Sequence, residues 1–147
     1  MTAIAYKDGV LAADEAVNFG VVDYQSNKVW KHNGYLMGMS GKACPPNDAV
    51  VEWLFKKTKK PETQSYLGPF QIPKMMFDVV VITPNKKILW IDSGGGVYPI
   101  QSKIWATGCG EDICIGAMAA GATAKEAVAW AIYYKDGCKG RVRYVSL

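Results

Sequence analysis

The amino-acid sequence predicts an α+β domain in which mainly antiparallel sheets are layered against helices. An Asp-Gly and an Asn-Gly signal separate short apolar segments near the amino terminus, and such signals are typical of β-hairpin turns. Two alanine-rich segments with helical spacing follow each other late in the chain. Of the 147 residues, 50% are hydrophobic and 20% are charged, and no repeat or change of composition divides them. We therefore expect a single domain over residues 1–147.

The first third of the chain predicts two hairpins and a helix. Residues 2–7 and 9–13 are apolar segments that meet at Asp-Gly, which indicates the first hairpin. Residues 28–31 and 35–40 flank the sequence His-Asn-Gly and indicate the second. A Pro-Pro-Asn-Asp start signal, followed by apolar residues at helical spacing, predicts a helix over residues 47–59.

The middle of the chain predicts a loop followed by strands. Residues 61–76 contain three prolines and show no period, which indicates a long loop. β-Branched residues dominate residues 77–83 and 87–91, which predict two strands. The run at residues 93–96, Ser-Gly-Gly-Gly, follows a strand but opens no helix, so it indicates a glycine turn instead of a phosphate-binding loop. A further strand is expected at residues 103–107.

The last third predicts two helices and a closing strand. Residues 110–121 and 124–134 have the helical pattern, and Thr123 with Glu126 three residues later forms a capping-box signal at the start of the second helix. Residues 141–147 alternate in the manner of a strand.

Composition argues against several classes of function. The formal net charge of +4 arises from scattered basic residues, so we expect no nucleic-acid binding. No apolar segment approaches the ~18 to 20 residues that span a bilayer, and the amino terminus lacks the features of a signal peptide. We therefore expect a cytoplasmic protein that is not attached to a membrane.

Cysteine, histidine and tryptophan give no independent sign of a site. The four cysteines form no CxxC pair, which predicts reduced thiols and neither a metal site nor a cofactor. His32, the single histidine, is interpreted as a turn residue and not as a catalytic base. The five tryptophans are interpreted as core or interface anchors. Asp14 and Glu15 are adjacent, so on a strand they face opposite sides and do not form a shared acid/base pair.

Thr2 is a candidate nucleophile because of its place in the chain. A small second residue permits removal of Met1, which leaves a threonine with a free α-amine. An α-amino group titrates at about 7.7 to 8.0, so it can act as the base for the hydroxyl of its own residue. Met-Thr is a common beginning, and Thr2 alone carries little weight.

The surrounding sequence resembles a known family. Residues 2–5, 7–14, 28–31 and 38–41 together resemble the amino-terminal half of proteasome β-type subunits and of the HslV peptidase, which belong to the Ntn-hydrolase superfamily. Residues 104–110 resemble the family's Gly-Ser-Gly turn, and residues 116–128 resemble its two carboxy-terminal helices. The resemblance implies a four-layer αββα sandwich with antiparallel sheets. One helical layer is reduced, because a single predicted helix stands where the family has two.

The resemblance also implies a catalytic set and a specificity pocket. Thr2 would be the nucleophile, with its α-amine as general base. Lys28 would favour the ionised hydroxyl, and Asp14 would pair with that lysine. The backbone N–H of Gly41 would contribute to the oxyanion hole. Supporting catalytic positions match Asp136 and Cys109, and the pocket positions match Val17, Met39 and Ala43.

The activity that the resemblance implies is that of a threonine-type peptidase. Such an enzyme would hydrolyse polypeptide substrates inside a self-assembled homo-oligomeric ring, and an ATP-dependent unfoldase would be a possible partner. No cofactor is implied.

Three positions depart from the family's pattern. Ala16 stands where the family has an arginine, and Cys109 and Lys139 stand where it has serines. In addition, a retained Met1 would acylate the α-amine and remove the base. These departures keep two alternatives open: a catalytically inactive proteasome-like structural subunit or decoy, and an Ntn amidohydrolase that acts on a small amide.

Overall fold

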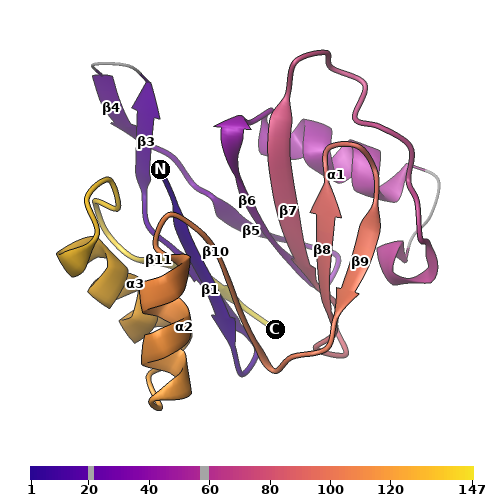
Figure 1. The fold of residues 1–147 in the computed structure, drawn as a ribbon. Coiled ribbons are helices and arrows are strands. Elements are labelled where there is room, and N and C mark those ends of the chain that lie inside the picture. The colour runs from indigo at the N-terminus through magenta and orange to yellow at the C-terminus, as the bar shows by residue number, and fades with distance from the viewer. Residues whose placement is uncertain (20–21, 57–59) are drawn as a thin grey trace.

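The fold consists of two antiparallel sheets with helices on their outer faces. The computed structural model describes residues 1–19, 22–56 and 60–147. One sheet has the strand order β10-β1-β2-β11, and the other has the order β5-β6-β7-β8-β9. Helices α2 and α3 lie against the first sheet and α1 lies against the second, so the layers run helix, sheet, sheet, helix (Figure 1). This arrangement confirms the predicted αββα sandwich, with α1 as the α-helix described in the reduced layer.

The first sheet is centred on the predicted amino-terminal hairpin. β1 (Ala3–Lys7) and β2 (Val10–Ala13) are joined by a turn in which Asp8 and Gly9 have φ values of 51° and 80°. Positive φ at both central residues is what a tight hairpin turn requires, and this explains the Asp-Gly signal. β10 (Ile104–Gly108) pairs with β1, and β11 (Arg143–Ser146) pairs with β2.

The second sheet begins with the other predicted hairpin. β5 (Val29–His32) and β6 (Tyr35–Ala43) are joined at Asn33 and Gly34, which also have positive φ. β7 (Met76–Ile82), β8 (Ile88–Asp92) and β9 (Val97–Ile100) complete the sheet, and the run of glycines between β8 and β9 is a turn as predicted.

The α-helices lie close to their predicted positions. They are α1 (Asn47–Phe55), α2 (Glu111–Ala119) and α3 (Ala124–Tyr134). The capping box at the start of α3 is present, because the Thr123 side chain accepts from the Glu126 N–H while the Glu126 carboxylate accepts from the Thr123 N–H. None of the described helices is both long and apolar enough to cross a membrane.

The structure corrects several details of the prediction. β3 (Ala16–Phe19), β4 (Val22–Gln25) and β9 were not predicted, and β3 and β4 form a separate two-stranded sheet. The expected loop at residues 61–76 includes a short 3-10 helix at Pro61–Thr63. His32 is the last residue of β5 and opens the turn at Asn33 and Gly34, and its ring packs against Phe55.

The helix expected over residues 47–59 is described only as far as Phe55, and residues 57–59 lie outside the described part of the chain. The predicted strands at 28–31, 77–83, 87–91, 103–107 and 141–147 are found with ends shifted by one or two residues.

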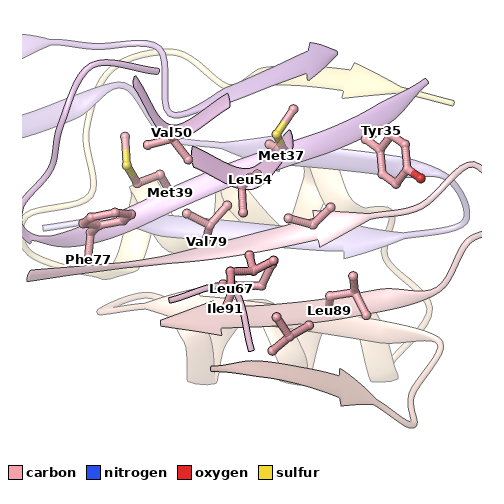
Figure 2. Close-up of a cluster of buried hydrophobic side chains, with 12 residues drawn as sticks. Tyr35, Met37, Met39, Val50, Leu54, Leu67, Phe77, Val79, Leu89 and Ile91 are labelled. Carbon is pink, nitrogen blue, oxygen red and sulfur yellow. The ribbon is translucent and has the colours of Figure 1, made fainter. Parts of the chain in front are cut away.

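Three apolar clusters hold the layers together. Between the two sheets lie fully buried branched side chains, among them Ile4, Leu11 and Leu36. The first sheet meets α2 and α3 through a layer rich in alanine, which allows the helices to approach closely. The second sheet meets α1 through larger residues, and Figure 2 shows Met37, Met39, Val50, Leu54, Val79 and their neighbours filling this layer.

Candidate active site

Thr2 is held by the loop that follows β10. It immediately precedes β1, and it is 9% exposed. The Gly110 N–H donates to the Thr2 carbonyl at 3.3 Å. Gly108 has a φ of +92°, and a Cβ there would lie only 2.1 Å from the Thr2 carbonyl oxygen, so this loop must approach Thr2 without a side chain. The alternation of β1 puts Thr2 on the face of Ile4, which is the face between the two sheets.

Asp14 connects the start of β1 to the carboxy-terminal loop. Its carboxylate is fully buried and accepts two hydrogen bonds at Oδ1, from Lys28 Nζ at 2.8 Å and the Ala3 N–H at 2.9 Å. Oδ2 accepts from the N–H groups of Lys139 at 3.2 Å and Ala16 at 3.3 Å. A buried carboxylate needs such compensation. Asp14 therefore fixes three chain segments around Thr2.

Lys28 brings a positive charge to the amino side of Thr2. The residue is 6% exposed, and its Nζ donates to Asp14 and, at 2.9 Å, to the carbonyl oxygen of Met1. That carbonyl belongs to the peptide bond that joins Met1 to Thr2. The ammonium group is thus buried beside the nitrogen of Thr2, and the structure brings together the three residues on which the predicted chemistry depends.

β6 contacts the segment that carries Lys28. The Met39 N–H donates to the Lys28 carbonyl at 3.0 Å, which ties β6 to the segment carrying Lys28. Desolvation raises the pKa of the Cys44 thiol, and the Lys28 ammonium and the amino-terminal group oppose this rise. Cys44 therefore lies within electrostatic reach of both. The sequence analysis did not single out Cys44, because nothing local marks it.

Gly41 sits in β6 where only glycine fits. A Cβ on Gly41 would lie 2.2 Å from the Met76 carbonyl oxygen. The register with β7 shifts between Gly41 and Ala43. Such irregularities redirect backbone groups away from the regular ladder.

Two of the three positions expected to form the pocket have described side chains. Met39 is 7% exposed and belongs to the cluster beneath α1, whereas Ala43 is half-buried at the end of β6. The side chain of Val17 lies outside the described residues.

The two remaining predicted positions belong to loops that flank Thr2. The Cys109 sulfur lies 3.4 Å from that of Cys138, which the sequence analysis did not single out. Asp136 is exposed, and its neighbour Gly137 lies against Met1, since a Cβ there would come within 2.1 Å of the methionine Cε.

Glu15 has a structural function that the sequence analysis did not identify. Its 2%-exposed carboxylate accepts from the Arg141 N–H at 2.9 Å and from the Arg143 guanidinium. The hydrogen bond from the Arg141 backbone, together with both arginine side chains, lowers the pKa of Glu15. Asp14 and Glu15 lie between β2 and β3 and not on a strand as expected, but they have different partners, and Glu15 anchors the approach to β11.

The arrangement places a buried cation next to the Met1–Thr2 peptide bond. A nearby positive charge favours an ionised hydroxyl and a neutral amine over their protonated forms. Lys28 carries such a charge, and its ammonium group is hydrogen-bonded to the Asp14 carboxylate and to the Met1 carbonyl. Within residues 1–19, 22–56 and 60–147, no three His, Cys, Asp or Glu side chains gather in a way that could hold a metal ion.

Comparison with known proteins identifies the class of fold. No family model and no curated protein sequence matches the chain. Among solved structures, eukaryotic HslV from Trypanosoma brucei matches with a TM-score of 0.67 and 14% identity, over 99% of this chain and 98% of that one. Thiobacillus denitrificans BPH in complex with epoxomicin matches with a TM-score of 0.62 and 18% identity, over 99% and 97% of the two chains. BPH alone gives the same TM-score and identity.

The chain therefore has an Ntn-hydrolase fold, with two antiparallel sheets between helical layers. Within that class it has the HslV-like form, and the match extends over nearly the whole chain.

Proposed function

We propose that this protein is a peptidase whose nucleophile is the hydroxyl of Thr2, exposed with a free α-amine after removal of Met1. The observation that carries the proposal is the buried Lys28 ammonium, which is paired with Asp14 and donates to the carbonyl directly in front of Thr2. A lysine exposed on the surface would need no such partners. A buried lysine is almost always paired, as Lys28 is here.

The proposed reaction proceeds through an acyl-enzyme ester. The α-amine takes the proton of the Thr2 hydroxyl, and the oxygen attacks the carbonyl carbon of the scissile peptide. The Gly41 N–H stabilises the oxyanion. The peptide C–N bond then breaks, and the α-ammonium returns its proton to the leaving amine. Water, activated by the same α-amine, hydrolyses the ester and restores Thr2.

The other site residues support this chemistry. Lys28 keeps the α-amine unprotonated, and Asp14 positions Lys28. Cys109 and Asp136 belong to the two loops around Thr2, and Val17, Met39 and Ala43 bind the substrate side chain next to the cleaved bond.

The decisive experiment combines intact mass with turnover. We expect the recombinant chain, made without an added amino-terminal extension, to lack one methionine and to cleave a panel of peptides. Thr2→Ala should lower kcat/KM on the order of 10⁴-fold or more while Thr2→Ser keeps measurable activity. Epoxomicin, the ligand in the BPH complex, should add its mass to Thr2 and not to the Thr2→Ala chain. Full activity of Thr2→Ala would overturn the proposal.

We further propose that the chain works in the cytoplasm as a homo-oligomeric ring on polypeptide substrates, with an ATP-dependent unfoldase as a possible partner. Light scattering should give a mass that is a multiple of 16.1 kDa. A monomer over the whole working concentration range would contradict ring assembly without bearing on Thr2.

The alternative is a catalytically inactive proteasome-like structural subunit or decoy. It is favoured by Ala16 and Lys139, which stand where the family has an arginine and a serine, and a retained Met1 would leave no α-amine on Thr2. An assembled protein that retains Met1 and cleaves no peptide would establish this alternative. Cleavage of small amides but not of peptides would instead indicate an amidohydrolase.

A further inference from the structure

Two cysteine thiols meet between the loops that flank Thr2. The sulfurs of Cys109 and Cys138 are 3.4 Å apart, although the residues are separated by 29 positions in the sequence. Cys109 belongs to the turn between β10 and α2, and Cys138 belongs to the loop between α3 and β11. A disulfide bond has an S–S distance of about 2.05 Å, so the two sulfurs, now 3.4 Å apart, must move closer by only about 1.4 Å.

The two thiols differ in access to solvent. Cys109 is half-buried and lines a shallow surface hollow together with Glu111, Asp112 and Lys135. Cys138 is 2% exposed, and burial together with the hydrogen bond to Cys109 raises the pKa of its thiol to about 12. An oxidant therefore reaches Cys109 first, and Cys138 is the thiol that reacts with the oxidised Cys109.

We propose that Cys109 and Cys138 are a reversible oxidation site that forms a disulfide under hydroperoxide and returns to two thiols under a dithiol reductant. This inference does not depend on the peptidase activity. Disulfides in reducing compartments are mostly transient or redox-sensing.

The proposed oxidation consumes one hydroperoxide for each disulfide that forms. The Cys109 sulfur, having lost its proton, attacks one peroxide oxygen, the O–O bond breaks, and hydroxide leaves and takes up that proton as water. Cys109 is then a sulfenic acid. The Cys138 sulfur attacks the Cys109 sulfur, the S–O bond breaks, and the hydroxyl group leaves with the Cys138 proton as a second water. Two thiols lose two electrons in total, and hydrogen peroxide gains them. A dithiol reverses the change by exchange.

The disulfide would join two segments that each contact the Thr2 site. Gly110, next to Cys109, donates to the Thr2 carbonyl. Lys139, next to Cys138, donates through its N–H to Asp14. Oxidation thus ties together the two loops that hold the nucleophile and the carboxylate behind Lys28.

The test counts free thiols in the full chain. Folded protein is treated with hydrogen peroxide, unfolded, and alkylated with iodoacetamide, and its mass is measured before and after dithiothreitol. The reduced chain should take four alkyl groups, one for each of its cysteines, and the oxidised chain should take two fewer. Peptide mapping should find Cys109 joined to Cys138, and dithiothreitol should restore full alkylation.

Control variants separate this pair from the other cysteines. Cys44 is exposed and Cys114 is buried away from solvent, so Cys44→Ser should leave the loss of two thiols unchanged. In that background, Cys138→Ala should stop cross-linking and leave Cys109 as a sulfenic acid that dimedone traps. The proposal is overturned if Cys109 and Cys138 remain alkylated while Cys44 oxidises, or if the cross-link forms equally fast in chain unfolded before oxidation. Because the readout is mass, an inactive but folded protein tests it as well as an active one.

Discussion

At the scale of single residues, the buried pair of Lys28 and Asp14 is the most informative feature. Removing two charges from water is costly, and the pair is tolerated because Asp14 accepts four hydrogen bonds and Lys28 donates to a backbone carbonyl. A buried ion pair adds little net stability to a fold. We interpret this pair as serving the chemistry proposed at Thr2.

We expect Asp14→Asn to destabilise the fold by about 3 to 5 kcal/mol, because it leaves the Lys28 ammonium buried without its counter-charge. Urea unfolding measures the change. Adding Lys28→Met to Asp14→Asn should recover part of the loss, since no unpaired charge then remains. Equal stabilities of the single variant and the wild type would show that the pair is solvated in solution.

Glu15 gives the fold a dependence on pH. Its pKa in the folded chain lies below the ordinary value of 4.5, because the Arg141 backbone N–H and the two arginines stabilise the carboxylate. Its contribution to stability is therefore complete above about pH 4.5 and is lost as pH falls through the lower, folded value. The urea midpoint should fall on acidification, and less so in Glu15→Gln. The matched variant Glu52→Gln, at an exposed position of α1, should keep the wild-type slope.

At the scale of elements, the sequence predicted strands and helices where the local signals were strong. The hairpin turns and the capping box are examples, since each depends on two to four neighbouring residues. β9 was missed because Pro99 normally interrupts a strand, and it is tolerated here because β9 is the edge of its sheet. β3 and β4 were missed because they are only four residues long and contain polar side chains.

The cap of α3 tests the strength of one such local signal. We expect Thr123→Ala to lower the free energy of unfolding by about 1 kcal/mol, because the Glu126 N–H then loses its side-chain acceptor. Thr123→Ser keeps the hydroxyl and should stay close to wild type. Thermal unfolding compares the three chains, and equal loss in both variants would assign the effect to packing instead of capping.

β6 offers a test at the candidate oxyanion position. Gly41→Ala places a methyl group where the Met76 carbonyl already lies, so we expect the strand end to shift and peptide turnover to fall. The loss should appear mainly in kcat if the Gly41 N–H binds the oxyanion. Because alanine keeps the backbone N–H, an unchanged kcat would contradict the expected shift and show that the strand end accommodates the methyl group in place.

At the scale of the whole molecule, the order of elements predicted the layers, whereas the site required long-range information. Thr2, Asp14 and Lys28 are brought together by the pairing of β1 with β2 and by the contact of β6 with the segment before β5. No local pattern encodes those contacts, and only the resemblance to a family suggested the set. The meeting of Cys109 with Cys138 depends in the same way on two distant loops, and sequence spacing gave no hint of it.

The core between the sheets should control global stability. Ile4 is fully buried and faces Gly38 of the opposite sheet, where an added Cβ would lie 3.2 Å from the Ile4 Cγ2 atom. We expect Ile4→Ala to cost about 2 to 5 kcal/mol and Ile4→Val about 0.5 to 1.5 kcal/mol. Ile72→Ala, at a site that is 42% exposed, should change stability by less than about 0.5 kcal/mol. Urea unfolding distinguishes these values.

The hydrogen bond from Lys28 to Met1 has a consequence for timing. While a residue precedes Thr2, the ammonium that would assist catalysis is occupied by that residue's carbonyl, and Met1 also packs on Gly137. In the proposed mechanism, the chain in this state is a zymogen whose own catalytic lysine holds the blocking group in place. In that mechanism activation waits for the removal of Met1, and the latent chain already carries the folded surroundings in which Thr2 would act.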